Sequence, residues 1–143
     1  MSRLIVCERS GRWSAGLERV LPSATPRTSV GSLILADEAL QISPHAFVVI
    51  EVAEAELTKS GLWLAGLASR YPQARAAAVG DLTMRACQAE LLEAGAVCCL
   101  WGLRRLRQLA PVIVRHLATA PRAPVALADE ILARLPWGDV ELP

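Results

Sequence analysis

The sequence contains few of the side chains from which most catalytic sites are built. Its 143 residues include one lysine, Lys59, two histidines, one tyrosine and one phenylalanine. Neither His45 nor His116 has a nucleophile or a carboxylate at a spacing that indicates a catalytic pair, and any mechanism that needs a lysine would have to use Lys59. We therefore expect that the protein is not an enzyme.

Cysteine is scarce and is not arranged to hold a metal ion. Cys7, Cys87, Cys98 and Cys99 include no CxxC pair, and no histidine lies close enough in sequence to complete a zinc pattern. Cys98 and Cys99 point to opposite faces if they lie in a regular strand, so they cannot easily bond to each other. We expect free, buried thiols in a reducing compartment, with no metal and no cofactor.

Neither a charge excess nor a long hydrophobic run is present. The 15 basic and 14 acidic residues nearly cancel, which argues against binding to nucleic acid or to an anionic membrane. Hydrophobic residues make up 53% of the chain, but runs such as LWLAGLA are far shorter than the roughly 20 residues of a membrane span. The start, MSRLIVCERS, has too short an apolar segment for a signal peptide, so a cytoplasmic protein is expected.

Short apolar runs alternate with segments of helical periodicity. The strands predicted in this way are 4–7, 27–30, 47–52, 76–79 and 97–100, and the helices are 11–21, 33–42, 58–71, 82–94 and 103–118. The segment SLILA within 32–36 could instead extend the second strand, and Pro111 predicts a kink or a break in the last helix. Five strand–helix units imply an α/β fold, a parallel sheet with helices on both faces.

Proline residues mark a change of character near the carboxyl end. After Pro121 and Pro124, the segment Val125 to Leu135 again carries apolar residues at helical spacing. We expect one domain over residues 1–118 and a proline-containing extension over 119–143 with a short amphipathic helix.

Three segments carry a resemblance to a known family. HAFVVIEV at 45–52, RYPQARAAAVGD at 70–81 and LLEAGAVCCLWGL at 91–103 are similar to the third, fourth and fifth strand regions of CheY-like receiver domains. These are the domains of bacterial two-component response regulators. The resemblance covers roughly residues 3–118 and implies a flavodoxin-like fold with strand order 2-1-3-4-5.

The same resemblance places the residues of a receiver phosphorylation site on this chain. The acidic pair that holds magnesium falls on Glu8 and Arg9, and the phosphorylated aspartate falls on Glu51. The hydroxyl residue falls on Gly80, the lysine on Gly102 and the switch aromatic on Cys99. All of these positions depart from the family pattern, which implies a pseudo-receiver that does not take up a phosphoryl group.

Three interpretations of this edge compete. Glu51 could imitate a phosphorylated aspartate, or Glu8, Glu51 and Asp81 could together hold magnesium. The simplest alternative is an ion-paired strand end in which Glu51 contacts Arg9, and we prefer it because the hydroxyl and the lysine that sense a phosphoryl group are absent.

A partner surface is predicted on the face of the fourth helix, fifth strand and fifth helix, through which receivers commonly dimerise or bind other proteins. Tryptophan and arginine are frequent at interface hot spots. The candidate residues, for a protein partner or a homodimer, are Trp101, Arg104, Arg105, Arg107, Leu109 and Val112. A tryptophan that only covers the core is an equal alternative.

The expected role is therefore signalling or regulation through protein–protein interaction. A competing class is a flavodoxin-like domain that binds a small molecule or nucleotide in the crevice around Glu8, Glu51 and residues 80–82. That class is weaker because ERSGRWS, which follows the first strand, contains only Gly11 and no glycine-rich phosphate loop.

Overall fold

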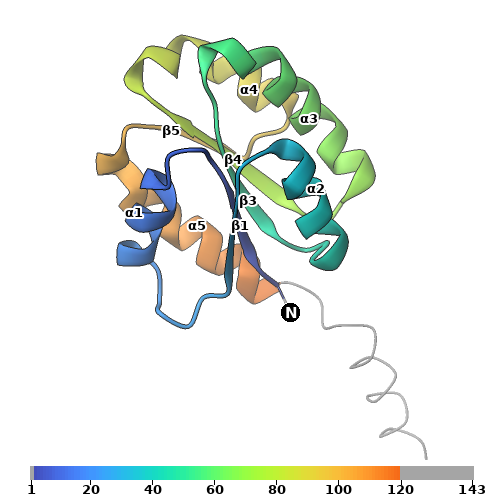
Figure 1. Ribbon diagram of the computed structural model, residues 1–143, viewed down its shortest axis with the longest axis vertical. Helices are drawn as coiled ribbons and strands as arrows, with labels where there is room; N and C mark the ends of the chain where they lie inside the picture. Colours follow the sequence, from blue (N-terminus) through green and yellow to red (C-terminus); the bar gives the residue numbers. More distant parts are fainter. Residues whose placement is uncertain (1, 120–143) are drawn as a thin grey trace, which may run out of the picture.

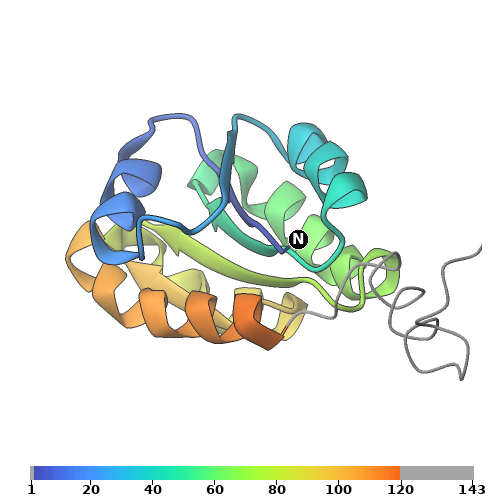
Figure 2. The ribbon, with the colours of Figure 1, turned by 90° about the horizontal axis from the view of Figure 1, so that it is seen from below.

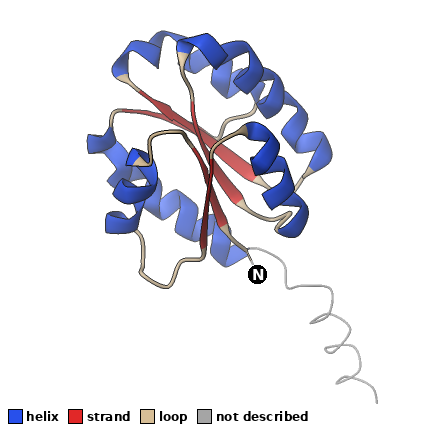
Figure 3. Ribbon diagram, in the orientation of Figure 1, coloured by secondary structure: helices blue, strands red, loops and turns tan. Residues whose placement is uncertain are grey.

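A computed structural model describes residues 2–119 and shows one parallel sheet between two layers of helices (Figure 1). The strands are β1 (Leu4–Cys7), β2 (Arg27–Val30), β3 (Phe47–Glu51), β4 (Arg75–Gly80) and β5 (Cys98–Trp101). The α-helices are α1 (Arg12–Val20), α2 (Leu33–Ile42), α3 (Leu57–Arg70), α4 (Gln88–Ala94) and α5 (Leu106–Thr119). Strands and helices alternate along the chain (Figure 3), as the sequence predicts.

The strand order is β2-β1-β3-β4-β5 and all four pairings are parallel. This arrangement confirms the flavodoxin-like, receiver-like fold. β1, β3 and β4 are almost completely buried because helices cover both faces of the sheet, which explains their nearly continuous apolar sequences.

The two faces of the sheet carry separate hydrophobic clusters. α1 and α5 pack on one face, through a cluster that includes Trp13, Leu17, Leu106, Leu109 and Ile113. α2, α3 and α4 pack on the other face (Figure 2). Cys98 contacts the first cluster and Cys99 the second, so the two thiols lie on opposite faces, as alternation along a strand predicts.

Three details of the helices differ from the sequence-based prediction or decide between its alternatives. α5 continues through Pro111, because this residue lies on the exposed side of the helix, where water can replace the missing hydrogen bond. The helix expected over 82–94 is divided into a 3-10 helix, Leu82–Cys87, and α4. Residues 33–42 are helical, and the Ser32 hydroxyl accepts the Leu35 N–H at the amino end of α2.

Two shorter 3-10 helices, Glu54–Glu56 and Leu103–Arg105, precede α3 and α5. The helix expected within Val125–Leu135 and nearly all of the extension lie outside the described residues. α5 is described as far as Thr119, one residue beyond the predicted domain boundary.

Candidate functional site

Glu8 follows β1 at the carboxyl edge of the sheet, and its carboxylate caps helix α1. Gly11, with a φ of 81°, turns the chain so that the first N–H groups of α1 face back toward Glu8. Glu8 Oε1 accepts the Trp13 N–H at 3.0 Å, and Oε2 accepts the Ser14 N–H at 2.6 Å. The Glu8 side chain is buried, and both of its carboxylate oxygens accept hydrogen bonds from the N-terminus of α1, where a negative charge is favourable.

Glu51, at the end of β3, is held by the same helix. The Trp13 indole Nε1 donates to Glu51 Oε2 at 2.7 Å, and the Trp13 side chain is itself almost completely buried. Arg12 Nη2 lies 3.7 Å from the same oxygen and 3.5 Å from Asp81 Oδ1. Two consecutive residues of α1 therefore bind the carboxylate that occupies the phosphoacceptor position.

Arg9 does not pair with Glu51, which corrects the expected contact. Its guanidinium instead forms an ion pair with Glu56, in the 3-10 helix that follows β3. Trp13 and Arg12 already contact Glu51 through its Oε2 atom, and Arg9 extends outward, with its side chain 77% exposed. The role of these two α1 residues was not predicted, although a tryptophan and an arginine directly after the Gly11 turn are the available signal.

These residues do not fit the magnesium ion that the receiver fold implies. Mg²⁺ requires carboxylate oxygens that are free to coordinate it in near-octahedral geometry. Glu8 has both oxygens bound to backbone N–H groups, and Arg12 lies between Glu51 and Asp81. Within residues 2–119 there is no group of three or more His, Cys, Asp or Glu side chains placed to hold a metal ion.

Position 80 has no room for the hydroxyl side chain that receivers carry there. A Cβ atom added at Gly80 would lie 2.9 Å from the Val52 carbonyl oxygen and 3.3 Å from Trp101 Cζ3. The indole of Trp101 packs directly over this glycine, and its Nε1 donates to Gln88 Oε1 at 2.7 Å. The end of β5 therefore covers the place where a phosphoryl-sensing hydroxyl would stand.

The two remaining receiver positions also lack the required chemistry. Gly102, at the lysine position, has a φ of 100°, a conformation that a lysine would adopt only with strain. Cys99, at the switch-aromatic position, is partly buried, and burial followed by the nearby Cys98 raises its pKa to about 11. Burial and the carboxylates of Glu56, Glu51 and Glu8 also raise the pKa of Cys7 to about 11, so both thiols are protonated at neutral pH.

A cavity of about 440 Å³ lies at this edge, between the amino ends of α2 and α3. Carboxylates and apolar side chains such as Leu33, Ile34 and Trp63 line it. Its carboxylates already have partners, since Asp37 accepts Trp63 Nε1 and Arg70 Nη1, each at 2.9 Å. Residues 80–82, which the predicted crevice included, do not line this cavity.

The predicted partner surface is partly buried. Leu109 is completely inaccessible in the α1–α5 cluster and Trp101 is 6% exposed, so neither side chain extends an interface as expected. Leu109 faces the sheet because it lies three residues after Leu106 and four before Ile113, on the same side of α5. Arg105 and Val112 are exposed, as expected.

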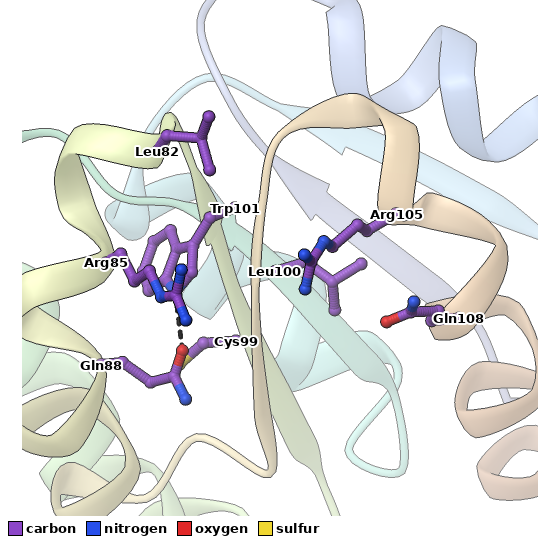
Figure 4. A pocket seen from close by; sticks show the side chains of 8 residues that line it. All are labelled: Leu82, Arg85, Gln88, Cys99, Leu100, Trp101, Arg105 and Gln108. Carbon is purple, nitrogen blue, oxygen red and sulfur yellow. Dashed lines mark hydrogen bonds between the residues drawn. The ribbon is translucent and has the colours of Figure 1, made fainter.

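Polar side chains, most of them exposed, surround a smaller hollow on this face, beside the edge strand β5. Figure 4 shows Arg85 and Gln88 on one side of the strand and Arg105 and Gln108 on the other. The hollow has a volume of about 220 Å³, and Leu82, 67% exposed, stands at its rim. Arg85, Gln88 and Gln108 were not predicted, because only the fold brings the start of α4 close to α5. Arg104 and Arg107 do not line this hollow.

Comparison with solved structures supports the receiver-like fold. A CheY-like protein, TadZ, from Pseudomonas aeruginosa PAO1 aligns with a TM-score of 0.66 and 22% identity over 87% of this chain and 99% of that one. The response regulator domain of Thermotoga maritima CheB aligns with a TM-score of 0.56 and 20% identity over 85% and 99%.

An atypical orphan response regulator, described as having a phosphorylation-independent regulatory mechanism, aligns with a TM-score of 0.60 and 13% identity over 86% and 100%. No family model matches the sequence, and no curated protein is similar to it. At these identities the similarity shows a shared fold. None of the helices within residues 2–119 has the length and apolar character needed to cross a membrane.

Proposed function

We propose that the protein is a pseudo-receiver that acts in signalling or regulation by binding another protein, without phosphorylation and without catalysis. The observation that carries this proposal is that helix α1 binds Glu8 and Glu51, the two carboxylates that stand at receiver-site positions. Glu8 binds the N–H groups of Trp13 and Ser14, and Glu51 binds the Trp13 indole.

A phosphorylated receiver signals through a change that begins at this edge, and the contacts here oppose such a change. Removing Glu51 from Trp13 and Arg12 would leave a buried indole N–H without an acceptor, which is costly. Gly80 supplies no hydroxyl, and Trp101 already occupies the space above it. These contacts stabilise the observed arrangement of the edge, which suits a constitutive binding surface.

The surface that best fits a protein partner is the exposed part of the α4–β5–α5 face. β5 is an edge strand, so the backbone groups on its outer side have no strand partner among residues 2–119. Arg85 and Arg105 flank it, and Gln88 and Gln108 add hydrogen-bonding groups. Arginine beside a partly apolar hollow is a frequent composition of protein interfaces.

The test compares the proteins retained from a cell extract by the immobilised wild-type chain and by Arg85→Glu/Arg105→Glu. Arg115→Glu serves as the control, because Arg115 is also exposed on α5 but does not line this hollow. We expect a partner that the double variant loses and the control keeps, and its binding should not change when acetyl phosphate is added. Retention by the double variant would refute this face as the interface, and acetyl-phosphate dependence would refute constitutive binding.

A further inference from the structure

A groove between α1 and the beginning of α5 carries an unusual concentration of positive charge. It has a volume of about 440 Å³, and four arginines, Arg12 and Arg19 from α1 and Arg104 and Arg107 from the other wall, line it. The remaining lining residues are small or apolar. The groove lies on the α1–α5 side of the sheet, so the α4–β5–α5 surface proposed above does not include it.

Three of these four arginines have no acidic partner within the described part of the chain. Arg12 is shared between Glu51 and Asp81, but no ion pair is formed there by Arg19, Arg104 or Arg107. The nearest acidic residue in the sequence of α1, Glu18, pairs with Arg27 of β2 at 3.5 Å. At the carboxyl edge, by contrast, the exposed Arg9 is matched by Glu56. The groove thus retains a positive potential that can attract an anionic group.

The floor of the groove is apolar and depends on a glycine. A Cβ atom added at Gly16 would lie 2.4 Å from Leu106 Cδ1, so α1 and α5 are in direct contact there. Leu103, which is 40% exposed, and Val20 complete the apolar surface between the guanidinium groups. A partner that combines acidic and apolar side chains would match both properties.

The composition favours carboxylates over nucleic acid. Arginine guanidinium groups can bind a carboxylate through two parallel hydrogen bonds. Among residues 2–119, no aromatic side chain lines the groove for base stacking, and the net charge of the chain is only +1. We propose that the α1–α5 groove is a docking site for an acidic, partly apolar segment of a protein partner, independent of the α4–β5–α5 surface.

The experiment measures binding of a fluorescein-labelled peptide, in which glutamates alternate with leucines, to the full chain by fluorescence anisotropy at low salt. The same peptide with glutamines in place of glutamates tests the need for charge. Arg104→Glu/Arg107→Glu alters the groove, and Arg75→Glu/Arg115→Glu makes the same change in net charge at residues that line neither the groove nor the hollow beside β5. All four arginines are exposed, so folding should persist, and circular dichroism melting checks that it does.

We expect the glutamate peptide to bind the wild-type chain and the Arg75/Arg115 variant alike, and to bind the groove variant about tenfold more weakly. The glutamine peptide should bind weakly to all three. Equal losses in the two variants would show a general charge effect, and binding of the glutamine peptide as tightly as the glutamate peptide would show apolar association. Either result would overturn the proposal.

Two further results would assign the groove to a different occupant and would also overturn it. The first is displacement of the peptide by a mixed-sequence oligonucleotide. In that case the oligonucleotide binds the wild-type chain more tightly than the peptide does, and the groove variant no longer binds the oligonucleotide. The second is a gain of more than about tenfold in peptide affinity when the acidic residues of 120–143 are changed to amides. Such a gain would mean that this segment of the chain itself competes with the peptide for the groove. Those residues are Asp129, Glu130, Asp139 and Glu141.

Discussion

The hydrogen bond from the Trp13 indole to Glu51 offers a quantitative test of how the carboxyl edge is held. Trp13→Phe keeps an aromatic ring in a site that is 1% exposed but removes the N–H that donates at 2.7 Å. Glu51→Met keeps a side chain of similar length but removes the acceptor. A hydrogen bond to a charged group contributes about 1.5–3 kcal/mol to stability, and Glu51 is only 21% exposed, so solvent screens it weakly.

A double-mutant cycle separates this contact from the change in packing. Urea unfolding of the wild type, the two single variants and the double variant, followed by circular dichroism, should give a coupling free energy of about 2 kcal/mol. The comparison is a second cycle with Arg12→Met, whose guanidinium is half-exposed and 3.7 Å from Glu51, and here the coupling should be below about 1 kcal/mol. If the Trp13–Glu51 coupling is no larger than about 0.5 kcal/mol, Glu51 is not held by the indole and the reasoning fails.

Two further predictions follow from local geometry. Gly80→Ser should lower the free energy of unfolding by about 1–3 kcal/mol, because its Cβ would lie 2.9 Å from the Val52 carbonyl oxygen. Gly61→Ala, with open space around the added Cβ, should raise the free energy of unfolding by about 0.5–1 kcal/mol. Similar destabilisation of both variants in urea melts would contradict the steric argument. The free energy of unfolding should fall as pH rises from about 9 to about 11, because the unfolded chain releases protons that Cys7 and Cys99 keep in the folded state. Cys7→Ala/Cys99→Ala should flatten this pH dependence. An unchanged slope would show that other groups cause the loss of stability.

The order of elements could be predicted from the sequence because periodicity is strong where both faces of a strand are buried. The apolar run 47–50 gave β3 its bounds within one residue, and the Gly95 turn marked the start of the fifth unit. Pro111 predicted a kink or a break, and the helix is not broken there, since the effect of a proline depends on whether its side of the helix faces solvent or the core.

The candidate site was predicted in its positions but not in its contacts. Glu8, Arg9, Glu51, Gly80 and Gly102 all lie in the segments that follow or end the strands, as the resemblance implied. The partners of the two carboxylates come from α1, because the turn at Gly11 decides where the first helical turn points. No spacing rule in the sequence encodes that direction.

The burial of the proposed interface residues was harder to predict, because burial within a helix depends on the elements that pack against it. Leu109 and Val112 were both candidate interface residues, yet one is completely buried and the other is 38% exposed. The adjacent Arg104 and Arg105 diverge, one toward the α1–α5 groove and one toward the hollow beside β5. Their separation follows from the 3-10 helix that precedes α5.

The measurement that tests the central claim most directly is the intact mass of the full chain after incubation with acetyl phosphate and magnesium. A receiver with a complete aspartate site, treated in parallel, confirms that the reagent is active. Because Glu8 and Glu51 are bound by α1 and Gly80 and Gly102 lack functional side chains, we predict an unchanged mass. A stoichiometric gain of one phosphoryl group, lost again in Glu51→Gln, would contradict the account.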